Sequence, residues 1–211
     1  MKAFRVMGRT LKAAYDDLFL CVFLSLAWWV GTFLVVTAAP VTVGIHHVAN
    51  RIANYRRVDN GFFWEAIRQN IGRGWLLFLI NLLVPVAILF NIWFYFNSRG
   101  WLSVIGVAWA WLLVLCLMIG QYLFPLLWQQ DTPDLRLALR NAALLTLRHP
   151  LYSFLMMIFQ LVLLAASAAL TLPLVLLAPA LIALAGNFAL AGLLQEMGLA
   201  PPPPEAPVRG A

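Results

Sequence analysis

The sequence predicts an all-α membrane protein with six transmembrane helices arranged as three hairpins, each preceded by a cytoplasmic amphipathic helix. Three observations lead to this fold class. Of the 211 residues, 64% are hydrophobic and only 10% are charged, whereas soluble domains are typically about 25% charged. Asp, Glu, Lys and Arg are absent from four long stretches, 18–50, 74–98, 100–130 and 149–195. The basic residues, in turn, fall almost entirely on one side of the membrane when six crossings are drawn.

The uncharged stretches supply the crossings, because about 20 helical residues span the hydrocarbon core of a bilayer. Residues 74–98 and 101–128 are each predicted to form one helix. The last stretch is long enough for two helices, 150–171 and 174–195. Pro173 separates them, since proline removes a backbone donor and clashes with the preceding turn.

The segment after Pro40 decides the number of crossings. Residues 18–38 make the first crossing, and Pro40 disfavours helix at the residue before it. Residues 42–57 then form an amphipathic helix, with apolar side chains on one side and histidine, asparagine and arginine on the other. Such a helix either lies flat on the membrane surface or returns through the bilayer.

The distribution of Lys and Arg favours the returning helix. If residues 42–57 lie on the surface, the chain crosses five times and its 14 basic residues divide into nine and five. If they cross, 13 basic residues lie on the cytoplasmic side and Arg99 alone lies outside. Short cytoplasmic loops are enriched in Lys and Arg, so the sequence predicts six crossings.

Three amphipathic segments, 1–17, 61–72 and 132–148, each precede one hairpin and are predicted to lie on the cytoplasmic surface. The transmembrane domain then covers residues 18–195. Residues 196–211 form a proline-rich tail that is expected to be polyproline-like or disordered.

Basic residues near these surfaces indicate anionic lipid as a partner. The net charge of +6 does not require nucleic acid, because basic residues along a lipid-embedded chain anchor its loops beside anionic headgroups. We therefore expect a multi-pass protein of the cell inner membrane, with both termini in the cytoplasm and a transport complex or a second copy as further candidate partners. The predicted interfacial lipid contacts are Arg5, Arg9, Lys12, Arg56, Arg57, Arg73 and Trp75.

Three short motifs resemble the YesL family, a group of bacterial integral membrane proteins that form a domain of unknown function. They are PVTVG (40–44), FFWEAIRQN (62–70) and LRNAALLTLRHP (139–150). The resemblance covers about residues 15–195 and implies the helical membrane fold. Family members are often encoded near carbohydrate-uptake systems, which implies a loose link to that process. The family offers no catalytic residues to transfer to this chain.

The possible ligand site is the polar side of residues 42–57, with Thr42, His46, His47 and Asn50. The two histidines depart from the YesL pattern, which has small residues or proline here. Ionisable groups at bilayer depth are often functional, but both rings could instead hydrogen-bond across the bundle. Adjacent helical positions point about 100° apart, and the crossings contain no acidic ligand, so we expect no metal and no cofactor.

Isolated polar residues also occur within the other predicted crossings. They are interpreted as hydrogen bonds between helices, whereas a transport path would require several of them on one face. They are Asn81, Asn91, Gln121, Gln160 and Asn187.

Enzymatic motifs are absent from the sequence. It contains no phosphate-binding glycine loop, zinc-protease motif or nucleophile elbow, and its eight acidic residues all lie outside the predicted crossings. The favoured function is a non-enzymatic accessory or scaffold protein. The alternatives are a small transporter for an uncharged solute, with a polar path near His46 and His47, and a histidine-dependent membrane enzyme.

Overall fold

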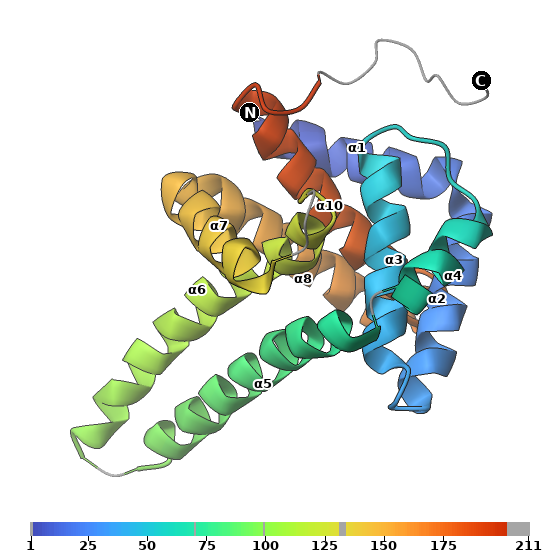
Figure 1. Cartoon of the computed structure of the whole chain (residues 1–211). Coiled ribbons are helices and arrows are strands. Elements are labelled where there is room, and N and C mark those ends of the chain that lie inside the picture. Colours follow the sequence, from blue (N-terminus) through green and yellow to red (C-terminus); the bar gives the residue numbers. More distant parts are fainter. Residues whose placement is uncertain (1, 70, 99, 131–133, 202–211) are drawn as a thin grey trace.

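The computed structural model describes residues 2–69, 71–98, 100–130 and 134–201, and the regular structure in these ranges is entirely helical (Figure 1). This agrees with the predicted all-α fold. The helices are α1 (Lys2–Asp16), α2 (Leu18–Phe33), α3 (Ala38–Ala53), α4 (Asn60–Gln69), α5 (Ile71–Phe96), α6 (Leu102–Leu127), α7 (Leu135–Arg148), α8 (Pro150–Leu170), α9 (Leu172–Leu176) and α10 (Ala178–Glu196).

Four helices, α5, α6, α8 and α10, are long and apolar enough to cross a membrane, and the number rises to five when α1 and α2 count as one bent span. The membrane class is therefore supported by the structure. The helix lengths alone do not give six crossings, because α2 and α3 have 16 residues each, or about 24 Å of helix.

The first hairpin differs from its predicted boundaries. The predicted helix 18–38 ends at Phe33, and the predicted helix 42–57 begins earlier and runs over Ala38–Ala53. Pro40 lies inside the first turn of α3, where a missing N–H leaves no intrahelical bond unmade. Pro40 is thus part of the first turn of this helix and does not precede it.

The last predicted crossing, 174–195, contains a break that the sequence did not predict. The short helix α9 is followed by a break at Leu177, and α10 starts at Ala178 rather than at residue 174. Pro179 stands near the start of α10 in the same first-turn position. The other crossings match their predicted ranges to within three residues at each end.

Helix α1 lies at 88° to α2 and packs along α10 (Figure 1). The protein-facing side of α1 consists of small side chains, since Ala3, Val6 and Ala13 are buried. Its large side chains Phe4 and Tyr15 are exposed by 58% and 78%. Helix α1 therefore differs from a simple amphipathic helix, since one side contacts protein and another presents large apolar groups to the surroundings.

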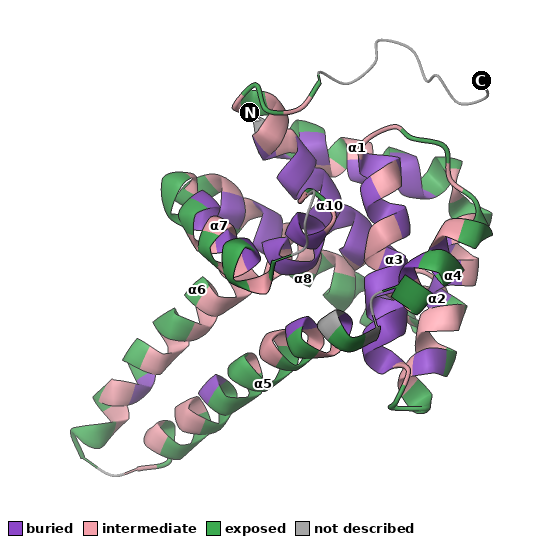
Figure 2. Ribbon diagram, in the orientation of Figure 1, coloured by how far each residue is buried: buried purple, intermediate pink, exposed green. Residues whose placement is uncertain are grey.

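Burial is concentrated in α3 and α10, whereas the α5–α6 hairpin extends away from them with most of its surface uncovered (Figure 2). Within the hydrophobic 18-residue stretch of α10, 72% of residues are buried, against 11% in each of α5 and α6. Of these helices α10 is also the least hydrophobic. Helices that contact lipid must be strongly apolar, while a helix surrounded by protein need not be.

Of the two short amphipathic helices, α4 packs along α3 and α7 packs on α6. Phe63 of α4 is fully buried against Gly44 of α3, where an added Cβ would lie 2.8 Å from the ring. Helix α7 packs on α6, and Thr146 donates a hydrogen bond to the Met118 carbonyl at 3.1 Å. The predicted segments at 61–72 and 132–148 are therefore helical where described. Most of the predicted tail, residues 202–211, lies outside the described residues.

Candidate functional site

A cavity of about 200 Å³ lies among α3, α5, α6, α8 and α10. One polar side chain from each of the first four of these helices reaches it, and Ile182 represents α10. The described residues that line the cavity include no Asp, Glu, Lys or Arg. The polar lining residues are His46, Asn81, Gln121 and Gln160.

His46 is held in place by a stacked ring and an amide. Its imidazole stacks on Phe124 with centroids 4.8 Å apart and planes 12° apart. Its Nδ1 lies 3.2 Å from Nδ2 of Asn187, which also donates to the Ala183 carbonyl at 2.8 Å. Because that carbonyl fixes the amide nitrogen of Asn187 as a donor, Nδ1 of His46 accepts and Nε2 carries the proton. The ring therefore has an N–H to offer a ligand in the cavity.

Gln121 and Gln160 are linked across two helices. Gln121 donates from Nε2 to the Met118 and Ser153 carbonyls, both at 3.0 Å. Its Oε1 accepts from Nε2 of Gln160 at 3.1 Å. These bonds use both donors of Gln121, so its orientation is fixed. Gln160 keeps one N–H and its carbonyl oxygen for other partners.

Asn81 lies directly against α6. An added Cβ on Gly120 would be 2.5 Å from the Asn81 Oδ1, so only glycine admits this amide without a shift. Among the residues that the structure describes, the Asn81 amide makes no hydrogen bond. A polar group without a partner in an apolar bundle is costly. Asn81 thus adds a donor and an acceptor to the cavity.

His47 lies on a different side of α3 from this cavity. Its ring centroid is 4.1 Å from that of Trp128 and 6.3 Å from that of Phe62. Arg51 in turn stacks on Phe62, with its guanidinium 3.6 Å from the centre of that ring. The divergence follows from the helical angle between neighbouring residues. His46 alone of the two histidines reaches the cavity.

Thr42 and Asn50, the other predicted site residues, make structural hydrogen bonds. Thr42 accepts from Nε1 of Trp28 at 3.0 Å and donates to the Ala38 carbonyl at 2.8 Å. Asn50 accepts from Nδ2 of Asn54 through its backbone and side-chain oxygens. The structure therefore divides the predicted polar face into one ligand-facing residue and several packing residues.

The predicted interfacial residues lie at the surface where their side chains are described. Arg5, Lys12, Arg56 and Arg57 are exposed, and Arg9 and Trp75 are half-buried. The side chain of Arg73 lies outside the described part of the structure.

The sequence points to the other polar residues of the site but does not show that they lie near one another. Asn81, Gln121, Gln160 and Asn187 come from four helices that are distant in sequence, and only the fold brings them around His46. The signal in the sequence is that at least one side-chain amide occurs well inside each of these apolar helices, with two in α5. This regularity, rather than the adjacent histidine pair, indicates the site.

The cavity offers hydrogen bonds but no charge. Among the described residues, no group of three or more His, Cys, Asp or Glu side chains is arranged to bind a metal ion. The arrangement can bind and orient an uncharged polar group among apolar side chains, where each hydrogen bond is stronger than in water. No protein-family model, curated protein or solved structure matches this chain.

Proposed function

We propose that the protein binds a small, uncharged, hydrogen-bonding solute inside its transmembrane bundle, as a small transporter does. The observation that carries this proposal is the cavity where Asn81, Gln160 and the Nε2–H of His46 have unused hydrogen-bonding capacity. Its volume of about 200 Å³ exceeds that of an engineered cavity of about 150 Å³ that holds benzene. A molecule with a few hydroxyl or amide groups fits this space.

The absence of charge in the lining selects a neutral solute. An ion moved into an apolar interior loses solvation that only an opposite charge or a dense set of dipoles replaces. The described lining supplies amides and one imidazole. A neutral polar solute loses far less on entry, and these groups can replace its hydrogen bonds with water.

For topology, we propose six passes in the cell inner membrane with both termini in the cytoplasm. In this arrangement α2 enters the bilayer, α3 returns, and α1 lies on the cytoplasmic surface in contact with anionic lipid. The 88° angle between α1 and α2 supports it, as do the exposed Arg5 and Lys12 beside the exposed Phe4. A helix with basic and large apolar groups suits the headgroup boundary.

Membership of the YesL family is part of the same proposal, and it rests on the three motifs and on the succession of surface helix and hairpin. The loose link of that family to carbohydrate uptake fits a hydroxyl-bearing solute. The hydroxyl group can both donate to Gln160 and accept from His46.

Thermal unfolding of the detergent-solubilised protein tests the binding site. Glycerol, erythritol and acetamide are the probes, and the melting temperature is followed for the wild type, Gln160→Leu and the control Asn91→Leu. Because glycerol also stabilises proteins by exclusion from their surface, binding is read as the difference between variants. We expect the wild type and Asn91→Leu to gain more stability than Gln160→Leu. Equal gains in all three proteins, for every probe, would contradict the proposal.

Labelling of single cysteines tests the topology. Cysteine is placed at Gly8, Asn60 or Ser98 in a chain with Cys21→Ala and Cys116→Ala, and a membrane-impermeant maleimide is added to one side of oriented vesicles. Positions 8 and 60 should react from the same side and position 98 from the other. Reaction of positions 8 and 60 from opposite sides would exclude a returning α3.

A non-enzymatic accessory role is the second candidate, favoured by the large apolar side chains that the α5–α6 hairpin leaves uncovered, such as Trp93 and Trp111. The two candidates differ in solute flux. Proteoliposomes that bind the probes at the Gln160-dependent site but do not pass them would support the accessory role, whereas Gln160-dependent flux supports the transporter.

A further inference from the structure

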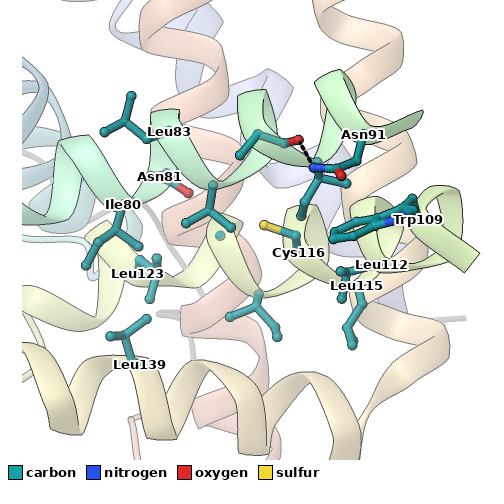
Figure 3. A pocket seen from close by; sticks show the side chains of 15 residues that line it. Ile80, Asn81, Leu83, Asn91, Trp109, Leu112, Leu115, Cys116, Leu123 and Leu139 are labelled. Carbon is teal, nitrogen blue, oxygen red and sulfur yellow. Dashed lines mark hydrogen bonds between the residues drawn. The ribbon is translucent and has the colours of Figure 1, made fainter. Parts of the chain in front are cut away.

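A second hollow, the apolar groove, lies between α5 and α6 and has a volume of about 700 Å³ (Figure 3). Its lining includes Val84 and Ile88 of α5 and Leu112 and Leu115 of α6, and Leu139 of α7 lies at one end. The Asn91 amide bonds back to the Ala87 carbonyl of its own helix at 2.8 Å. The groove therefore presents hydrocarbon to whatever occupies it.

The apolar groove is open to the surroundings of the bundle. Leu83, Val84 and Leu112 are exposed by 55%, 44% and 43%. They belong to two of the helices that are long and apolar enough to cross a membrane. A molecule dissolved in the hydrocarbon can reach the groove sideways, without passing through water.

The apolar groove and the polar cavity share a wall. Asn81 and Gly120 line both hollows, and the Asn81 Oδ1 lies where a Cβ on residue 120 would otherwise stand. Figure 3 shows Asn81 on α5 at the end of the groove nearer Leu123 and Leu139, away from Asn91. The apolar surface thus borders the hydrogen-bonding groups at Asn81.

We infer that the ligand is an uncharged amphiphile whose polar headgroup occupies the cavity at His46 and Gln160 and whose hydrocarbon chain lies in the apolar groove. This inference rests on the proposed function and names its ligand class. The polar cavity alone is smaller than the about 300–1,000 Å³ usual for small-molecule sites, and the groove supplies the missing volume. Each buried methylene of a chain adds to affinity, while the amides select the headgroup.

Asn81 occupies the boundary between head and chain. Its unpartnered amide can bond an ester or hydroxyl oxygen at the point where a headgroup joins a hydrocarbon chain. Gly120 leaves room for this amide, because Gly120→Ala would force Asn81 to move. The pair therefore positions the ligand, with polar contacts on one side and hydrocarbon on the other.

The test compares three probes on the full-length protein in detergent, with apparent affinity read from the rise in melting temperature. The probes are 1-monooleoylglycerol, glycerol and oleate, which respectively provide head and chain, the head alone, and the same chain with a charged head. The variants are Ala87→Phe, which fills the apolar groove, and Val86→Phe, which places the same aromatic ring at an exposed position outside its lining. Gln160→Leu removes a headgroup contact, and Leu112→Trp fills the groove from α6 if Ala87→Phe does not fold.

We expect 1-monooleoylglycerol to bind more tightly than glycerol by at least about a hundredfold, because the chain buries apolar surface. Ala87→Phe should weaken 1-monooleoylglycerol by about tenfold and leave glycerol unchanged. Val86→Phe should change neither. Gln160→Leu should weaken both, and oleate should bind more weakly than 1-monooleoylglycerol.

Failure of the amphiphile and failure of the polar site give different results. If glycerol binding depends on Gln160 but 1-monooleoylglycerol is no tighter or ignores groove filling, the proposed function stands and the amphiphile inference is overturned. If Gln160→Leu changes no probe, both are overturned. A dimer that Ala87→Phe dissociates, without bound 1-monooleoylglycerol, would assign the apolar groove to a second copy of the chain and also overturn the inference.

Discussion

The hairpins α2–α3 and α5–α6 differ in the length of their helices and in how much of them is buried. Helices α2 and α3 have 16 residues each, α3 is buried along nearly its whole length, and the turn between them is apolar. Helices α5 and α6 have 26 residues each, are mostly uncovered, and are joined through Asn97 and Ser98. The comparison teaches that high hydropathy marks exposed helices such as α2, α5 and α6, whereas α3, at the centre of the bundle, can be short and more polar.

The polar cavity lies where these two hairpins meet. Helix α3 contributes His46, while α5 and α6 contribute Asn81 and Gln121. Protein surrounds α3, so Thr42, His46 and Asn50 find hydrogen-bonding partners that lipid could not provide. The contrast between the hairpins is therefore also the origin of the site.

The largest expected effect comes from a matched pair of glycine substitutions. In α3, a Cβ on Gly44 would lie 2.8 Å from the buried ring of Phe63, and in α6 a Cβ on Gly106 would lie 3.2 Å from the half-exposed ring of Phe96. Gly44→Leu should lower the free energy of unfolding by about 3 kcal/mol, because the buried ring cannot move aside. Gly106→Leu should cost less than about 1 kcal/mol. Thermal unfolding in detergent measures both, and equal losses would remove the distinction between a packed and an uncovered hairpin.

An intermediate effect is expected at the two turns. Phe33 and Val36 are exposed by 80% and 74%, and a turn of such residues is more stable in hydrocarbon than in water. Val36→Cys should therefore react with a membrane-impermeant maleimide about tenfold more slowly than Ser98→Cys. Both are compared in the chain with Cys21→Ala and Cys116→Ala. Equal rates would mean that the short hairpin passes fully into the outer aqueous phase.

The smallest effect concerns single hydrogen bonds. Thr42→Val removes the acceptor for the Trp28 indole and should cost about 0.6 kcal/mol, the average for hydrogen bonds between membrane helices. Asn91→Leu removes an exposed hydrogen bond within α5 and should change stability by less than about 0.5 kcal/mol. Urea or thermal unfolding of both variants in the same detergent gives the comparison. A larger loss from Asn91→Leu would indicate that the hairpin is covered by a partner.

Much of the fold could be predicted because membrane helices follow simple rules of composition. The uncharged stretches gave α5, α6 and α8 nearly to their ends. The start of α3 was wrong, because Pro40 was taken as a boundary outside the helix and not as part of its first turn. The break at Leu177 has no single strong signal, since Pro173 and Pro179 both fit the first turn of a helix.

The candidate site was only half predictable. His46 could be singled out because an ionisable group inside an apolar stretch is rare. The sequence could not separate it from His47, since both lie at the same depth and only the packing partners differ. Asn81, Gln121 and Gln160 belong to the site because three separate helices approach one another, and periodicity within each helix carries no information about such an approach.

The neighbouring histidines provide the most direct test of the polar cavity. The measurement is the glycerol-dependent rise in melting temperature of His46→Leu and His47→Leu, each compared with the wild type. His46 lines the cavity and His47 does not. His46→Leu should therefore weaken glycerol binding by about tenfold, and His47→Leu should retain wild-type binding. An unchanged rise in His46→Leu, or an equal loss in the two variants, would contradict a binding site in this cavity.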